Sequence, residues 1–212
     1  PFFVQARECR TLQGQRKHSS FLVEEDLVLD LLTSSYSVTA IFFSDKRWEK
    51  ELPPSIPSYK INQGMMKKLY PTGKTPTLVA LCQQKALSLE SFATKKCLVA
   101  LEALQDPGNV GTMLRTCEAF GIEGAIIITE DVTQMYNRVT VKSARGSFFR
   151  QDFCLTSLKD FLSFAKKHSF SILSTSPHGD TLCKTSLTPS APHIIVFGNE
   201  TSGISAKMEE HT

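Results

Sequence analysis

The sequence lacks the features that mark a membrane or secreted protein. No apolar run approaches the roughly 20 residues that a membrane-spanning helix requires. The opening PFFVQARECR has no long apolar stretch followed by a cleavage site, so it does not resemble a secretory signal. The six cysteines form no CxxC pair, and most stand in apolar runs, which predicts buried thiols in a reducing compartment. We therefore expect a cytoplasmic protein with no membrane association.

Motifs for metals and for the common nucleotide folds are also missing. The five histidines show no metal-ligand spacing such as HExxH, so we expect no metal site. Neither GxGxxG nor GxxxxGK[ST] occurs, which leaves a dinucleotide or P-loop phosphate site without support. A dinucleotide-dependent oxidoreductase therefore remains only as an alternative, suggested by the alternation of strands and helices described below.

The composition of the 212 residues is that of an ordinary globular protein. Apolar residues make up 41% and charged residues 21%, which argues against disorder and against a fibrous repeat. The net charge is only +3, but residues 1–100 carry 14 Lys and Arg against 9 Asp and Glu, while residues 101–212 carry 10 against 12. A basic front half suits a module that faces nucleic acid, although an ordinary solvated surface has the same balance.

The front half contains the elements of a small α/β domain. Strands are predicted by the apolar runs at 38–44 and 77–82. A helix is predicted within 24–35 and a shorter one within 62–77, ending before Pro71. The Pro-rich stretch 51–60 predicts a loop, and the polar stretch 83–96 predicts a linker. We expect two domains, at 1–90 and 91–212.

The back half alternates strands and helices in the order that builds a parallel sheet. Helices are predicted at about 109–120 and 157–168. Four apolar runs predict strands at 97–102, 124–129, 170–175 and 193–198. The first strand, first helix and second strand form a βαβ unit.

Two polar segments follow strands of this predicted sheet. DPGNVGTMLRT (106–116) follows the first strand, and FGNETSG (197–203) ends the last one. Open α/β sheets bind ligands at the carboxyl ends of their strands, and the glycines of the second loop allow close backbone approach. Arg115 is expected to face away from the core stripe of its helix, which comprises Val110, Met113, Leu114, Cys117 and Phe120.

Together these segments resemble the SpoU branch of the SPOUT methyltransferases. The resemblance rests on ALQDPGNVGTMLRTCEAFG (103–121) and IIVFGNETSGIS (194–205) and covers roughly residues 97–205. VKSARGSFFR (141–150) is similar to the family's KASAGA segment, with Arg145 before the glycine. KHSSFLVEE (17–25) looks like the opening of the family's small RNA-binding domain, with Glu25 where the family usually has Gly.

The resemblance implies an RNA ribose 2′-O-methyltransferase that uses S-adenosylmethionine, acts on transfer or ribosomal RNA and forms a homodimer. The implied fold is α/β: a parallel-sheet domain with a C-terminal trefoil knot, preceded by a small α/β substrate-binding domain. The family's third motif, a segment with Ser-Leu-Asn, does not occur before Thr212, so the native chain is expected to continue. A non-catalytic RNA-binding protein with the same fold is the alternative.

The resemblance also assigns roles to residues. Asn109, Arg115 and Glu200 match the family's motif residues and are the predicted catalytic residues. Since an arginine stays protonated, Arg115 is expected to act as an electrostatic stabiliser and phosphate clamp. The predicted cofactor-binding residues are Thr175, Gly198, Asn199 and Gly203. The predicted RNA-binding residues are Arg16, Lys17, Lys67, Lys68, Lys142 and Arg145.

Overall fold

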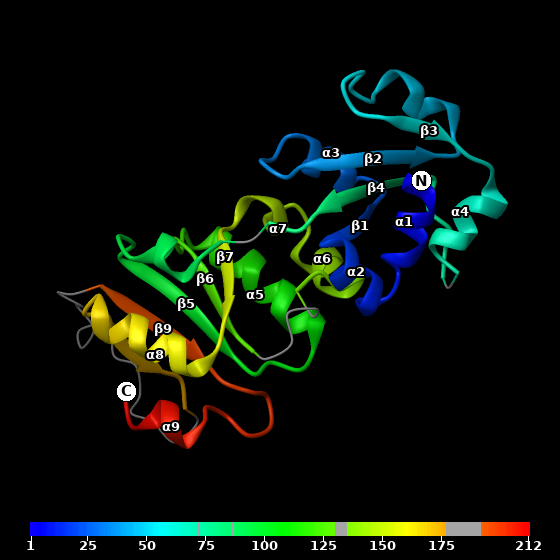
Figure 1. Cartoon of the computed structure of the whole chain (residues 1–212). Helices are drawn as coiled ribbons and strands as arrows, with labels where there is room; N and C mark the ends of the chain where they lie inside the picture. Colours follow the sequence, from blue (N-terminus) through cyan, green and yellow to red (C-terminus); the bar gives the residue numbers. More distant parts are fainter. Residues whose placement is uncertain (72, 86, 130–134, 177–191) are drawn as a thin grey trace. The chain divides into compact units, whose positions relative to one another are not determined.

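The chain divides into two compact units in a computed structural model that describes residues 1–71, 73–85, 87–129, 135–176 and 192–212 (Figure 1). Unit 1 comprises Pro1–Lys85 and Thr133–Phe149, and unit 2 comprises Ala86–Val132 and Arg150–Thr212. The sequence pattern placed the boundary near residue 90 and gave no sign that a later segment returns to the first unit.

Unit 1 is built on a four-stranded sheet of order β1-β4-β2-β3. Strand β4 pairs antiparallel with β1 and β2, and β3 pairs parallel with β2. The strands are β1 (Ser20–Glu24), β2 (Val38–Phe43), β3 (Ser58–Lys60) and β4 (Leu78–Gln83). The helices from the front of the chain are α1 (Phe2–Glu8), α2 (Leu12–His18), α3 (Leu27–Leu32), η1 (Lys46–Lys50) and α4 (Gln63–Leu69).

The sequence pattern found the two inner strands of unit 1 and missed the two edge strands. Strands β2 and β4 are apolar and were predicted, whereas β3 lies inside the stretch 51–60 that was predicted to be a loop. All three residues of β3 are exposed, so no burial pattern distinguishes this strand from the Pro-rich loop before it. Strand β1 was also missed, because the buried run SFLVE shows no alternation.

Glu25 follows β1 in the left-handed backbone region, with φ of 52°. This conformation is unfavourable for residues other than glycine, which agrees with the glycine expected here from the resemblance. The Glu25 carboxylate accepts hydrogen bonds from Thr77 N at 2.7 Å and from Thr77 Oγ1 at 3.2 Å. The Glu25 backbone N–H donates to Leu78 O at 3.0 Å. These bonds offset the backbone strain, so glutamate is accommodated at this position.

The returning segment of unit 1 begins before α6 (Arg138–Ala144) and ends within α7 (Ser147–Arg150). It is attached by aromatic packing, since the Phe148 ring lies 5.7 Å from that of Phe21, centroid to centroid. It is also attached by charge, because Arg138 donates from Nε and Nη2 to the Glu24 carboxylate of β1 at 2.9–3.1 Å. Glu24 is only 6% exposed, so this charge needs the paired cation.

Unit 2 is built on a five-stranded parallel sheet of order β7-β6-β5-β9-β8. The strands are β5 (Cys97–Glu102), β6 (Ala125–Ile128), β7 (Phe153–Thr156), β8 (Ser171–Ser174) and β9 (His193–Phe197). The helices are η2 (Leu89–Phe92), α5 (Pro107–Ala119), α8 (Leu158–Lys167) and α9 (Ala206–Glu209). The four strands and two long helices predicted for this half are confirmed to within two residues at each end, while β7 was missed.

The order of the strands in unit 2 creates one reversal point, where the connections from neighbouring strands run in opposite directions across the parallel sheet. The chain runs outward from β5 to β6 and β7, crosses to β8 at the other edge, and returns through β9 to lie beside β5. Right-handed crossovers then place α5 and α8 on opposite faces of the sheet. Ligands of open α/β sheets bind at such a reversal, beyond the carboxyl ends of the strands. Here that place lies between β5 and β9.

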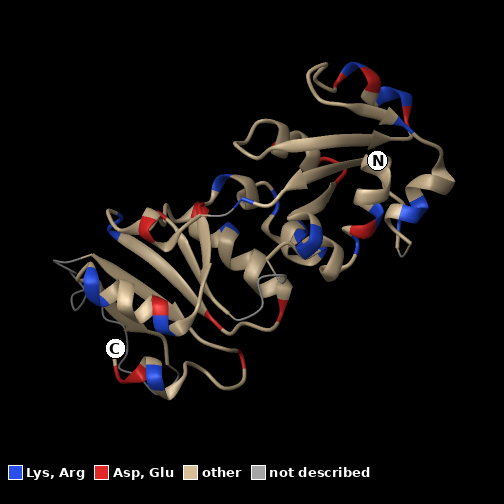
Figure 2. Ribbon diagram, in the orientation of Figure 1, with Lys and Arg blue, Asp and Glu red and all other residues tan. Residues whose placement is uncertain are grey.

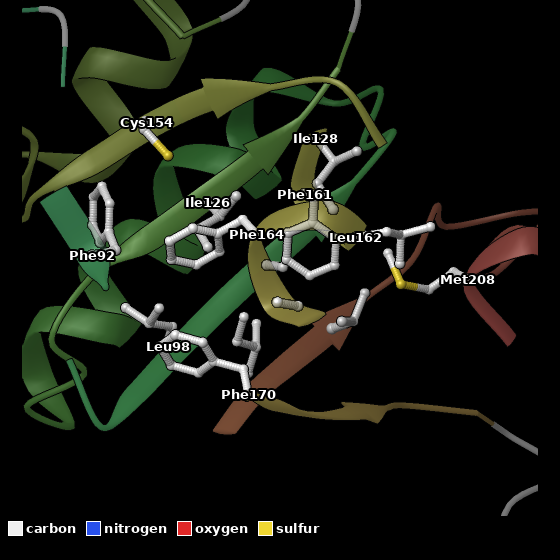
Figure 3. Close-up of a cluster of buried hydrophobic side chains, with 14 residues drawn as sticks. Phe92, Leu98, Ile126, Ile128, Cys154, Phe161, Leu162, Phe164, Phe170 and Met208 are labelled. Carbon is white, nitrogen blue, oxygen red and sulfur yellow. The ribbon is translucent and has the colours of Figure 1, made fainter. Parts of the chain in front are cut away.

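The core of unit 2 between α8 and the sheet is shown in Figure 3. Alternate residues of the strands, including Leu98 and Ile126, point toward Phe161 and Phe164 of α8. Phe92 joins this cluster and is 1% exposed, although it comes from the stretch 83–96 that was predicted to be a linker. Full burial of such a side chain contributes about 1.5–3 kcal/mol. The stretch is therefore part of the core, and its scattered apolar residues, Phe92 with Leu87 and Leu89, were the available signal.

Helix α5 confirms most of the predicted core stripe, with one error. Val110, Leu114 and Cys117 are buried, but Phe120 is 79% exposed. The helix ends at Ala119, and Gly121 turns the chain in the left-handed region, with φ of 68°. Ile122 N then donates to Cys117 O at 2.9 Å, a C-terminal cap that directs the chain away before Phe120 reaches the core.

The cysteines of the described residues are free thiols. Cys9, Cys82, Cys117 and Cys154 are buried as predicted, Cys97 is half-buried, and Cys183 lies outside the described residues. Burial raises the pKa of the Cys9 and Cys117 thiols to about 11, so these groups are protonated and unreactive at neutral pH. Among the described residues, no helix has the length and apolar character needed to cross a membrane.

Candidate functional site

The two polar segments meet at the reversal point of the unit 2 sheet. Strands β5 and β9 pair from Cys97 with His193 to Leu101 with Phe197, so the loops after them begin side by side. Asn109 Nδ2 donates to Glu200 Oε1 at 2.9 Å, and Gln105 N donates to Glu200 Oε2 at 3.4 Å. Asn199 Nδ2 donates to Ala103 O at 2.9 Å. Three predicted site residues, Asn109, Asn199 and Glu200, are thus brought together.

Local sequence fixes the start of α5 and with it the position of Asn109. Asp106 caps the helix, since its Oδ1 accepts from Gly108 N at 2.7 Å, and Pro107 occupies the first turn, where no backbone donor is needed. Asn109 therefore stands in the first turn with its side chain exposed. The helix begins two residues before the predicted start because of this cap.

The second loop, 198–203, is held by its own backbone. Asn199 and Gly203 exchange two backbone hydrogen bonds at 2.8 and 2.9 Å, and Asn199 Oδ1 accepts from Thr201 N at 2.9 Å and Ser202 N at 3.0 Å. A Cβ atom on Gly198 would lie 2.3 Å from the backbone carbon of Gly203. Gly198 is therefore required for the closure of this loop, which presents Glu200 toward Asn109.

The bond to Asn109 lowers the pKa of the Glu200 carboxyl below its usual range, with help from backbone hydrogen bonds that include the one from Gln105 N. The carboxylate is consequently ionised at neutral pH and acts as an acceptor only. Since its pKa is lowered and not raised, Glu200 is poorly suited to donate a proton or to serve as a general base near neutral pH. Its hydrogen bonds fit a structural role, in which Glu200 connects the loop after β9 to the loop and helix after β5.

Glu102 also stabilises the candidate site, although it was not among the site residues predicted from the sequence. It ends β5, is 5% exposed, and accepts from Ser205 Oγ at 2.6 Å and Ser205 N at 3.0 Å. Ser205 in turn caps α9 by accepting from Met208 N. A carboxylate at the end of the apolar run CLVALE was the available signal, because a buried charge needs partners. Glu102 thereby ties the chain after the second loop to the first strand.

The remaining predicted residues of unit 2 lie at the edge of this arrangement. Thr175 follows β8 and donates from N and Oγ1 to Val196 O of β9 at 3.0 and 3.2 Å. Arg115 lies six residues after Asn109 on α5, about 9 Å along the helix axis. Arg115 is exposed, as expected, and forms no hydrogen bond or ion pair with any residue that the structure describes.

The predicted RNA-binding residues all belong to unit 1 and all are exposed. Figure 2 shows basic residues on α2, α4 and α6, the helices that carry most of them. Lys17 pairs with Glu8 at 2.8 Å, and Lys142 pairs with the buried Glu24 at 3.1 Å. Arg145 has φ of 54° and ψ of −146°, an unfavourable conformation for any residue with a side chain.

These features define a class: an open, parallel α/β protein with a candidate ligand site at the reversal point of its sheet. Two structures share the fold over nearly the whole chain. An AdoMet-bound rRNA methyltransferase from Sinorhizobium meliloti has a TM-score of 0.86 and 21% identity, covering 100% of this chain and 83% of that one. The SpoU methyltransferase AviRb from Streptomyces viridochromogenes, in complex with AdoMet, has a TM-score of 0.84 and 20% identity, covering 99% and 84%.

The chain belongs to the SpoU rRNA methylase family, whose family model matches residues 96–212. It is 26% identical over 208 residues to the 23S rRNA (guanosine(2553)-2'-O)-methyltransferase RlmP of Bacillus subtilis, covering 97% of this chain and 82% of that protein. It is 31% identical over 125 residues to the 23S rRNA (guanosine-2'-O-)-methyltransferase RlmB of Yersinia pestis, covering 58% and 49%. The predicted family and α/β fold are confirmed; the trefoil knot stays a prediction.

Proposed function

We propose that the protein transfers a methyl group from S-adenosylmethionine to a ribose 2′-hydroxyl of RNA. The observation that carries the proposal is the meeting of the family's two motif segments through the Asn109–Glu200 hydrogen bond, at the place where open α/β sheets bind ligands. The relatives from Bacillus subtilis and Yersinia pestis are 23S rRNA 2′-O-methyltransferases, and the RlmP match extends through both units.

The second loop fits a bound S-adenosylmethionine in its chemistry. Its backbone is fixed by the Asn199–Gly203 hydrogen bonds, and a Cβ on Gly203 would meet no atom within 4 Å, so a ligand could approach its backbone closely. Gly198, Asn199 and Gly203 would hold the cofactor, with Thr175 on the neighbouring strand. When bound, the cofactor supplies an electrophilic methyl group on a sulfonium.

Arg115 is the residue that we assign to the chemistry. A ribose hydroxyl is a poor nucleophile, so the site must orient the hydroxyl and stabilise the negative charge that develops on its oxygen. The Arg115 guanidinium stays protonated, has no partner among the described residues, and is fixed to a long helix. It would hold a neighbouring phosphate and stabilise the developing oxyanion, while Asn109 and Glu200 hold the two loops in place.

We further propose that the protein acts as a homodimer in the cytoplasm, and that its substrate is ribosomal RNA. The free thiols support a reducing compartment, and the named relatives support the RNA class. Light scattering tests the dimer. For the reaction, labelled S-adenosylmethionine is incubated with the protein and rRNA, and the modified nucleotide is mapped. Label in a 2′-O-methyl group is expected; RNA binding without transfer would favour a non-catalytic RNA-binding protein.

A further inference from the structure

Unit 1 contains a polar cavity of about 250 Å³ that the proposed reaction does not use. Four parts of the sequence line it: the residues around the start of α2, Leu22 of β1, the end of α4, and the residues that lead into α6. The polar residues among its lining are Arg10, Thr11, Gln15, Tyr70, Asn137 and Arg138. Ligand pockets for larger molecules measure about 300–1,000 Å³, so this cavity suits one small planar group.

Gln15 gives the cavity an unmet hydrogen-bonding need. The residue is 6% exposed, and its Nε2 donates to Tyr136 O at 3.4 Å. Its Oε1 is buried and has no hydrogen-bond partner among the described residues. The orientation of the amide is fixed, since a flip would set Oε1 against the Tyr136 carbonyl oxygen. A buried acceptor without a partner is unfavourable, and an N–H donor from an occupant would satisfy it.

Arg10 gives the cavity a cation that can meet an anion. Its Nη1 donates to Lys68 O at 2.6 Å, which fixes the side chain beside the end of α4. It pairs with no carboxylate in the part of the chain that the structure describes, whereas the Arg138 charge is neutralised by Glu24. Arginine donors in this position suit a phosphate group.

Arg138 and Tyr70 give the cavity a flat surface. The Arg138 guanidinium lies 4.6 Å from the centre of the Tyr70 ring, and its bonds to Glu24 hold the plane in place. Proteins that recognise unpaired RNA bases stack them on aromatic rings or on arginine planes and bind their edges by hydrogen bonds.

We infer that this cavity holds one unpaired nucleotide of the RNA substrate, with the base against the Arg138 guanidinium, a base N–H toward Gln15, and the phosphate at Arg10. The inference rests on the proposed function for its choice of RNA. Because Gln15 Oε1 is covered, the base would reach it only if the side chain shifts slightly while the amide keeps its orientation. The cavity would thus position the RNA by binding one nucleotide, which is separate from the nucleotide that receives the methyl group.

The test titrates AMP, GMP, CMP and UMP into the isotope-labelled protein and follows backbone amide shifts by NMR. Shifts should concentrate at residues 9–15, 69–71 and 136–138. Arg10→Gln should weaken binding by about tenfold or more, the effect of losing a charge-assisted bond. Arg7→Gln is the matched control, since Arg7 is exposed and does not line the cavity. Shifts spread elsewhere, or equal weakening by both variants, would overturn the inference.

Two further measurements separate this inference from the proposed function. Single-stranded RNA hexamers should compete with the mononucleotides; if they do not, the cavity serves a free nucleotide and the assignment to RNA is wrong. Methyl transfer to rRNA is measured in parallel. Transfer by the wild type with no shifts at the cavity would refute the cavity alone, whereas nucleotide binding at the cavity without any transfer would refute the proposed function alone. A thermal melt confirms that both variants are folded.

Discussion

Asn109 donates a hydrogen bond to Glu200 at 2.9 Å across a sequence separation of 91 residues. The bond joins the first turn of α5 to the loop after β9, and it exists because β5 and β9 are neighbours although β6, β7 and β8 lie between them in the chain. The Asn109–Glu200 bond can therefore form only when the candidate site is correctly assembled.

The Asn109–Glu200 bond should show coupling in a double-mutant cycle. Asn109→Ala and Glu200→Ala should each lower the free energy of unfolding, and the double variant should lose less than the sum of the two. We expect a coupling of about 0.5–1 kcal/mol, because the pair is exposed to water. Urea unfolding measures it. Strict additivity would show that the two side chains do not stabilise each other.

The stability that Glu200 provides should depend on pH in a defined direction. Hydrogen bonds lower its pKa in the folded state, so its contribution is present above the unfolded value of about 4.3 and is lost as the pH falls through the folded value. Glu200→Gln should therefore be less stable than the wild type at pH 7, with a difference that shrinks below about pH 4. Glu210→Gln, at an exposed position outside the two loops, is the matched control. A Glu200→Gln difference that grows in acid would contradict the assigned geometry.

Gly198→Ala should disrupt the second loop. The new Cβ would lie 2.3 Å from Gly203 backbone atoms, which cannot rotate aside as a side chain can. We expect a loss of about 1–3 kcal/mol in unfolding free energy and a large loss of S-adenosylmethionine affinity. Gly203→Ala is the comparison, because its Cβ meets no atom within 4 Å and only its positive φ is unfavourable. The check is calorimetric titration. If Gly198→Ala and the wild type bind S-adenosylmethionine with equal affinity, the assignment of this loop to the cofactor is wrong.

Arg145 offers a test in which stability and RNA affinity change in different ways. Arg145→Gly should raise the thermal midpoint by relieving a backbone strain of about 1–3 kcal/mol, less the backbone entropy that glycine loses on folding. Arg145→Ala keeps the strain. If Arg145 contacts an RNA phosphate, both variants should reduce the slope of log affinity against log salt by about 0.7–0.9. An unchanged slope in both would assign the side chain to ordinary surface.

What the sequence predicted, and what it missed, has a physical pattern. Strands β5 and β9 and helix α5 were predicted because apolar runs and apolar periodicity are local signals, and the two motif loops followed from the strand ends. The returning segment around Phe148 and the core role of Phe92 depend on contacts between residues distant in the sequence, which no local pattern records. Phe120 was misassigned because the helix ended one residue earlier than the periodicity suggested. The cavity at Gln15 also depends on contacts between distant residues, since four separate segments form it.

Arg115→Ala should abolish most methyl transfer while the fold and cofactor binding persist. Arg115 is exposed on α5, opposite the buried Val110, Leu114 and Cys117, so its removal opens no cavity, and the unfolding free energy should change by less than about 0.5 kcal/mol. Loss of one preorganised charge at a developing oxyanion lowers the rate by about 10²–10³.

The two remaining variants decide how Arg115 acts. Arg115→Lys should recover little activity, because an ammonium group cannot reproduce the planar, two-pronged guanidinium. Arg150→Lys is the matched control: Arg150 is also an exposed arginine of unit 2, but its guanidinium pairs with Glu118 and belongs to no predicted site. The assay is single-turnover transfer of labelled methyl to rRNA, with calorimetric titration of S-adenosylmethionine and a thermal melt on each variant. Wild-type turnover in Arg115→Ala would remove Arg115 from the chemistry, and an early melt would make its role structural.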